Sequence, residues 1–126
     1  MKIRVEITKE PLAGRGVTSA DGASGAVVEF AGVVRGEEEG APITSLEYEA
    51  YEVMARSEME RIVRELSARF PCHDIQIAHR IGQVPAGEAS ILVRIAAKHR
   101  AEAFGMLTEF MDRLKRDVPI WKNVVS

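Results

Sequence analysis

The chain has 126 residues, a length typical of one domain with a substantial core, and we expect a single domain over residues 1–126. Hydrophobic residues make up 46% and charged residues 29%, which are ordinary values for a globular protein. The net charge of −2 excludes an overall positive field that would attract nucleic acid or anionic lipid, so any anion site has to be local.

Residues 2–8 alternate apolar and polar side chains and predict a first strand, with Ile3, Val5 and Ile7 on one face. This stretch lacks the apolar segment of a signal peptide, and no apolar run approaches the ~18 residues of a membrane span. We therefore expect a cytoplasmic protein. Residues 11–25, rich in Gly, Ser and Asp, predict a loop.

Residues 26–35, AVVEFAGVVR, predict the second strand. Phe30 and Gly32 share one of its faces, and a glycine there leaves space for another group to approach the backbone. Arg35 has the opposite parity to Phe30, so we expect it to leave the core face and enter the loop that follows. A turn then leads to a third strand within residues 43–52, ITSLEYEAYE.

Apolar residues recur three and four positions apart between residues 55 and 70 and predict a helix, which a following proline ends. Two further strands are predicted at 74–84 and 89–97, on either side of the turn PAGE. A second helix is predicted from about His99 to Lys115, before Pro119.

The predicted order is therefore β–β–β–α–β–β–α. Short turns between consecutive strands favour a mainly antiparallel sheet with two main helices packed against it, which is an α+β fold.

Three residues that can carry positive charge, Lys98, His99 and Arg100, stand where the second helix begins. The amino-terminal end of a helix is itself positive and repels cations. Such a cluster makes sense if a phosphate or carboxylate neutralises it, because free backbone N–H groups at that end also bind anions. The alternative is that these side chains simply point into water.

A second basic group occurs at the far end of the same helix, in LKRDVPIWK. Lys115 has a structural explanation, since the helix dipole favours a cation there. Lys122 either belongs to a frayed tail or is held in place, if Pro119 and Trp121 pack the tail against the body. Arg35 is a third candidate, because its planar guanidinium suits phosphate, although a strand-end arginine is usually just solvated.

Common catalytic motifs are absent from the sequence: there is no GxSxG, HExxH, GxxxxGK[ST] or GxGxxG. Cys72 is the single cysteine, which excludes an internal disulfide, and we expect a small buried side chain. The three histidines lack metal-ligand spacing, and His79 is expected to be a satisfied core or edge residue. What remains is a set of basic residues that can bind an anion and stabilise developing negative charge.

Four segments carry a resemblance to a known family: GAVVEFAGVVRG, LEYEAYEVMA, HRIGQVPAGEASILVRIAAKHRAEAF and LKRDVPIWK. Together they cover most of residues 25–122, and they resemble the large, catalytic subunit of molybdopterin synthase. The resemblance implies an α/β-hammerhead fold, a homodimer within a heterotetramer, and no metal or organic cofactor.

The activity implied by the resemblance is a sulfur transfer in molybdenum cofactor biosynthesis. Members of that family convert cyclic pyranopterin monophosphate to molybdopterin. The sulfur arrives as a thiocarboxylate on the C-terminal Gly-Gly of a small ubiquitin-like subunit. No nucleic acid or membrane partner is implied.

The resemblance also implies site residues. Lys115 and Lys122 would be catalytic, beside the incoming thiocarboxylate. The substrate-binding residues would be Arg35, His99, Arg100, Phe30 and Met111. We expect the five basic residues among these to surround one hollow. The sequence after WK is NVVS instead of the charged tail usual in the family, which leaves the composition of the pocket across the dimer open.

Two other hypotheses remain at this point. The chain could be a non-catalytic binding module for a phosphorylated, pterin-like small molecule. It could also be a scaffold that only docks the ubiquitin-like subunit.

Overall fold

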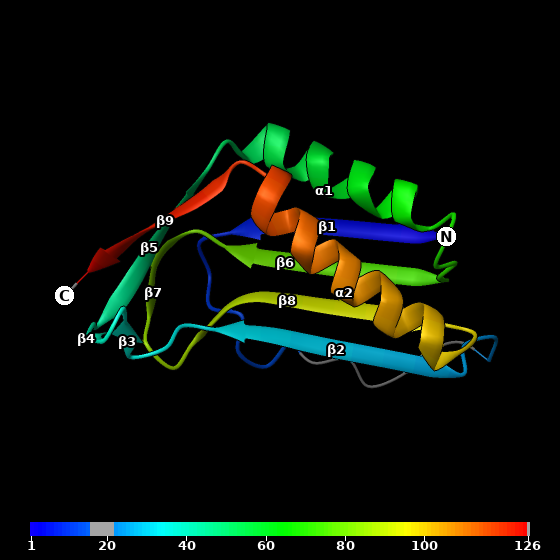
Figure 1. Cartoon of the computed structure of the whole chain (residues 1–126), viewed down its shortest axis with the longest axis horizontal. Helices are drawn as coiled ribbons and strands as arrows, with labels where there is room; N and C mark the ends of the chain where they lie inside the picture. Colours follow the sequence, from blue (N-terminus) through cyan, green and yellow to red (C-terminus); the bar gives the residue numbers. More distant parts are fainter. Residues whose placement is uncertain (16–21, 126) are drawn as a thin grey trace.

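The computed structural model describes residues 1–15 and 22–125. The larger sheet has four strands in the order β1 (Lys2–Thr8), β6 (Asp74–Arg80), β8 (Ala89–Ala97) and β2 (Ala26–Val33). Strand β1 runs parallel to β6, and the other two pairs are antiparallel. Helices α1 (Glu52–Leu66) and α2 (Arg100–Asp117) lie over one face of this sheet (Figure 1). The predicted mainly antiparallel α+β fold with two helices is confirmed.

A second sheet stands at one end of the first (Figure 1). Its strands follow the order β7 (Gly82–Pro85), β5 (Ser45–Ala50) and β9 (Ile120–Val125), all antiparallel. A short hairpin of β3 (Glu37–Glu38) and β4 (Ala41–Pro42) precedes β5. The predicted loop at 11–25 contains residues 16–21, which lie outside the described residues.

Strand β9 was not predicted, because its sequence, IWKNVV, does not alternate cleanly between apolar and polar residues. It pairs with β5 along its whole length, from Ile120 opposite Ala50 to Val125 opposite Ser45. The tail is therefore held against the body, and the alternative of a frayed tail is wrong.

The predicted strand at 74–84 is divided in two. Strand β6 ends at Arg80, and β7 begins at Gly82 in the other sheet. Gly82 has a φ of 84°, a left-handed conformation that costs glycine little and other residues more. An alternating sequence pattern does not reveal this change of sheet, which coincides with the positive φ of Gly82.

Helix α1 ends at Leu66, four residues before the predicted end at Phe70. The Ser67 hydroxyl donates a hydrogen bond to the carbonyl oxygen of Arg64 at 2.7 Å. Serine side chains that bond to the backbone in this way favour helix ends over helix interiors. The apolar stripe continues past the helix because Phe70 still packs against the core from the following turn.

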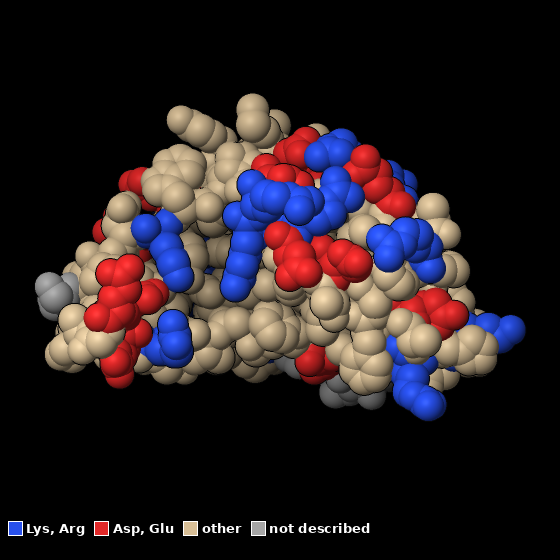
Figure 2. Space-filling view, in the orientation of Figure 1, with Lys and Arg blue, Asp and Glu red and all other residues tan. Residues whose placement is uncertain are grey.

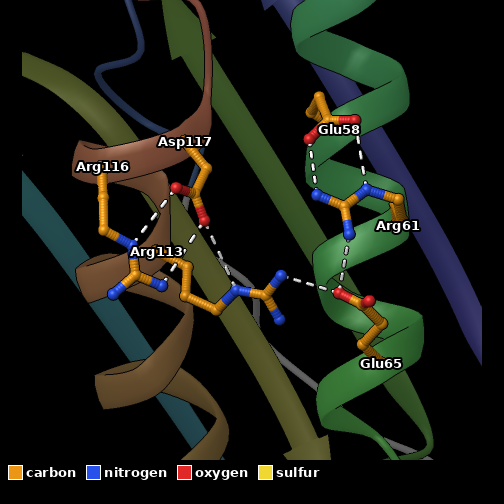
Figure 3. A network of polar contacts seen from close by, with 6 residues as sticks. All are labelled: Glu58, Arg61, Glu65, Arg113, Arg116 and Asp117. Atoms are coloured by element: carbon orange, nitrogen blue, oxygen red, sulfur yellow. Dashed lines mark hydrogen bonds and ion pairs between the residues drawn. The ribbon is translucent and has the colours of Figure 1, made fainter.

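A network of ion pairs joins α1 to the carboxyl-terminal half of α2 (Figure 3). Arg113 donates to Glu65 at 2.7 Å, and Glu65 also accepts from Arg61 at 2.9 Å. Arg113 lies 3.7 Å from Asp117 on its own helix. The hydrogen bond from Arg113 lowers the pKa of Glu65. Networks hold geometry better than isolated surface pairs do, so this one fixes the end of α2 that carries Lys115.

The main core lies between the helices and the four-stranded sheet. Helix α2 contributes Ala103, Met106, Phe110 and Leu114, all buried. In the part of the chain that the structure describes, neither helix combines the length and the apolar character needed to cross a membrane.

We expect Phe110→Ala to lower the free energy of unfolding by about 3–5 kcal/mol, because it removes a large side chain that is only 1% exposed. Phe104→Ala is the matched control on the same helix, since Phe104 is 54% exposed, and it should change the value by less than about 0.5 kcal/mol. Urea unfolding followed by circular dichroism measures both. Equal effects of the two substitutions would contradict the described packing of α2.

Candidate functional site

A cavity of about 470 Å³ opens where the carboxyl-terminal end of α2 meets the second sheet. Phe30 of β2 and Met111 of α2 supply apolar wall, and Ile91 and Ile120 extend it. Gly32 lies in the same wall, where an added Cβ would come within 2.8 Å of Ile91. The glycine therefore leaves room for the Ile91 side chain, and this approach to its backbone agrees with its position in the predicted strand.

Two lysines reach this cavity from different elements. Lys115 lies in the last turn of α2, next to Leu114, which is 8% exposed. Lys122 lies on β9, directly opposite Tyr48 of β5 in the antiparallel register. Two positive charges beside an apolar wall suit an elongated ligand that has an anionic end.

Arg35 is exposed in the loop after β2 and lines a neighbouring hollow, whose other lining residues are Gly36, Glu37, Glu39 and Gly40. One guanidinium nitrogen lies 4.0 Å from a carboxylate oxygen of Glu38. The other oxygen of Glu38 accepts from Lys122 Nζ at 3.3 Å. Arg35 and Lys122 are thus neighbours across one carboxylate.

His99 and Arg100 lie at the opposite end of α2, His99 being the N-cap residue. A helix rises 1.5 Å per residue, so the backbone of Arg100 is roughly 22 Å from that of Lys115. Figure 1 shows the two ends of α2 over opposite ends of the sheet. The expectation that all five basic residues surround one hollow is therefore wrong within a single chain.

The surface around the cavity carries charges of both signs. On the face shown in Figure 2, basic side chains border a hollow on the side of β9, and acidic side chains stand close to them. This mixed arrangement agrees with the overall charge of −2, because basic and acidic side chains are interspersed on this face.

His79 also lines the cavity, although its sequence position indicated only a core residue. It is 5% exposed, and its Nδ1 donates to the carbonyl oxygen of Arg80 at 2.8 Å. Its ring meets that of Tyr48 edge-on, with centroids 5.3 Å apart. Burial lowers the pKa of His79, so the ring is neutral at pH 7 and its Nε2 is an acceptor. The expectation of a core residue agrees with its burial, but the cavity beside it forms only where the two sheets meet.

Comparison with known proteins adds to this geometry. The family model described as "MoaE protein" matches residues 7–117. The chain belongs to the MoaE family. It is 48% identical over 103 residues to the molybdopterin synthase catalytic subunit of Pyrococcus abyssi, a match that covers 82% of this chain and 70% of the relative.

Other members of the family are longer. The human molybdopterin synthase catalytic subunit is 40% identical over 101 residues, which are 80% of this chain and 54% of the relative. The rice relative is likewise covered over 54% of its length. The chain thus spans about half the length of these curated relatives.

Solved structures of the family share the fold. The crystal structure of molybdopterin synthase from Staphylococcus aureus superposes with a TM-score of 0.87 at 33% identity, covering 95% of this chain and 89% of that one. A protein–protein complex of subunits 1 and 2 of molybdopterin-converting factor from Helicobacter pylori matches with a TM-score of 0.71. At 21% identity, this second match shows the fold alone.

Within residues 1–15 and 22–125, no three His, Cys, Asp or Glu side chains gather in a way that could hold a metal ion. Besides the lysines, the imidazole of His79 and the apolar wall, the lining includes Tyr48, Ser90 and Trp121.

Cys72 lies outside this cavity, as a free and buried thiol. Burial, with a contribution from the nearby charge of Glu102, raises its pKa to about 11. A thiol attacks as the thiolate, so Cys72 is a poor nucleophile at neutral pH. Cys72 is also not among the residues that line the cavity.

We expect Cys72 to react with iodoacetamide at pH 8 about 100-fold more slowly in the folded chain than in the urea-unfolded chain. The reason is that a pKa of about 11 instead of the ordinary 9.0 lowers the thiolate fraction by that factor. The rate for the folded chain should keep rising up to about pH 11, whereas the unfolded chain levels off near pH 9. Similar rates at pH 8 would contradict the described burial; mass spectrometry measures both.

Proposed function

We propose that this chain is the catalytic subunit of a molybdopterin synthase. It would transfer sulfur from the C-terminal thiocarboxylate of a small ubiquitin-like subunit to cyclic pyranopterin monophosphate. The observation that carries the proposal is the cavity in which Lys115 and Lys122 meet, in a chain of the MoaE family. We further propose that residues 1–126 act as one domain, and that the protein is cytoplasmic, where a free thiol such as Cys72 persists.

The two lysines have complementary roles in this proposal. Lys122 holds the anionic end of the sulfur donor, because it is fixed by the pairing of β9 with β5. Lys115 lines the same cavity as an exposed side chain, so its charge can approach a bound ligand and stabilise negative charge that develops there. Phe30 and Met111 pack against the ring system of the substrate. Lys115 can act through its charge or through a transient covalent bond from its amine, and substitution separates the two.

His99 and Arg100 enter the proposal through a second copy of the chain. They are too far from Lys115 to touch the same small molecule in one chain. We therefore infer that a dimer places His99 and Arg100 of one copy near the lysines of the other, where they bind the cyclic phosphate. Arg35 lies close to Lys122 in the loop after β2, and in this proposal it helps to bind the cyclic phosphate.

We expect Lys115→Ala to lower turnover at least about 100-fold while leaving substrate affinity within a few-fold, because the charge acts mainly on the transition state. The assay combines the purified chain, thiocarboxylated small subunit and cyclic pyranopterin monophosphate, and measures dithiolene product. Lys9→Ala, an exposed lysine away from the cavity, is the control and should keep full activity.

Lys115→Arg distinguishes the two mechanisms, because arginine keeps the charge but has no nucleophilic amine. Activity retained in this variant supports charge stabilisation, and activity lost to the level of Lys115→Ala supports covalent chemistry. A wild-type chain that binds substrate and makes no product, under conditions where a known catalytic subunit works, would refute the proposal and favour a binding module.

Mixing two inactive variants tests the shared pocket. If each pocket combines Lys115 of one copy with Arg100 of the other, dimers of Lys115→Ala with Arg100→Ala contain one intact pocket. Random exchange of subunits should then restore about a quarter of wild-type activity. If each pocket is formed within one chain, mixing should restore no activity. The control is a mixture of the two variants in which subunit exchange is prevented, and it should also show no activity.

A further inference from the structure

Glu38 occupies the space between two of the basic residues of the site. Its carboxylate oxygens lie 3.3 Å from Lys122 Nζ and 4.0 Å from a guanidinium nitrogen of Arg35. The side chain of Glu38 is only 22% exposed, whereas those of Lys122 and Arg35 are 54% and 82% exposed. The described chain thus places its own carboxylate in the position that suits an anionic ligand.

The backbone explains why Glu38 takes this position. Glu39 and Gly40 form the turn between β3 and β4, with φ angles of 51° and 82°. Two consecutive positive φ angles are characteristic of the tight turns that join hairpin strands. The turn fixes the register of β3, and neighbouring residues of a strand point to opposite faces. Glu38 therefore faces Lys122, and Glu37 does not.

The contact is weak enough to be exchanged. Both cations are more than half exposed, and ion pairs between exposed groups contribute little because water and salt screen them. It also joins residues 84 positions apart in the sequence, so it depends on the folded arrangement of the hairpin and β9.

We propose that Glu38 is an internal competitor for the carboxylate-binding position at Lys122. A carboxylate that enters the cavity has to displace Glu38 before it pairs with Lys122. The hairpin thereby weakens the binding of free carboxylates, and a donor that makes further contacts elsewhere on the chain is favoured over them. The inference rests on the proposed function in taking Lys122 to hold the anionic end of the sulfur donor.

The test measures binding of acetyl-glycylglycine, a small probe with a free carboxylate, by nuclear magnetic resonance titration of the 15N-labelled chain. Glu38→Gln keeps the shape of the side chain and removes its charge. We expect it to lower the Kd of the probe about two- to five-fold at low salt, the size that an exposed ion pair allows. The gain should shrink at high salt, where such pairs are screened.

Glu37→Gln is the matched control, since it removes the same charge from the neighbouring residue, which lines the hollow of Arg35 but does not pair with Lys122. It should change the Kd less than about 1.5-fold. The uncharged amide acetyl-glycylglycinamide should bind all three proteins equally weakly. Equal gains in Glu38→Gln and Glu37→Gln would overturn the proposal, because net charge would then explain them. Absence of probe binding to every variant would overturn it too.

The outcome is separable from that of the proposed function. If only Glu38→Gln binds the probe more tightly and the wild-type chain makes no dithiolene product, the internal competitor is supported and the proposed enzymatic function is refuted. If the wild-type chain forms product and both glutamine variants gain the same affinity for the probe, only the proposal of an internal competitor is refuted.

Discussion

The pairing of β5 with β9 is the constraint on which the site depends. Six residues on each strand are in register, and Lys122 is fixed opposite Tyr48 as a result. Trp121, from the same strand, donates to Glu49 at 2.8 Å and packs edge-on against Tyr51. Without this pairing, the cavity would have one lysine and an open side. The second sheet is small, but it turns a helix end into a binding site.

The local structure of the chain could largely be predicted from periodicity. Alternating residues located β2 and β8, and the three-to-four spacing located both helices, because side-chain direction follows directly from these repeats. The sequence could not predict β9, whose residues are mostly exposed and owe their conformation to a partner strand. The sequence also did not predict the change of sheet at Gly82, because the alternation of apolar and polar residues carries no information about a positive φ angle.

The site was predictable in part, chiefly through the resemblance of its segments to the catalytic subunit of molybdopterin synthase. Proline and tryptophan near Lys122 suggested a packed tail, and the structure brings Lys115, Lys122, Phe30 and Met111 to one cavity. The grouping with His99 failed because it treated residues at both ends of one helix as neighbours. The length of the predicted helix already separated them. The contribution of His79 could not be predicted, because it arises where two sheets meet.

The long reach of the strand pairs also bears on how the protein folds. Strand β1 pairs with β6, which lies more than sixty positions later in the sequence, and β5 and β9 are separated by a similar distance along the chain. Chains dominated by such distant contacts fold more slowly than helical bundles, because many residues must be ordered before the contacts form. The helices can form early from local interactions, but Lys115 and Lys122 meet only when the second sheet is complete. A partly folded chain therefore lacks the binding site even when most of its helix is present.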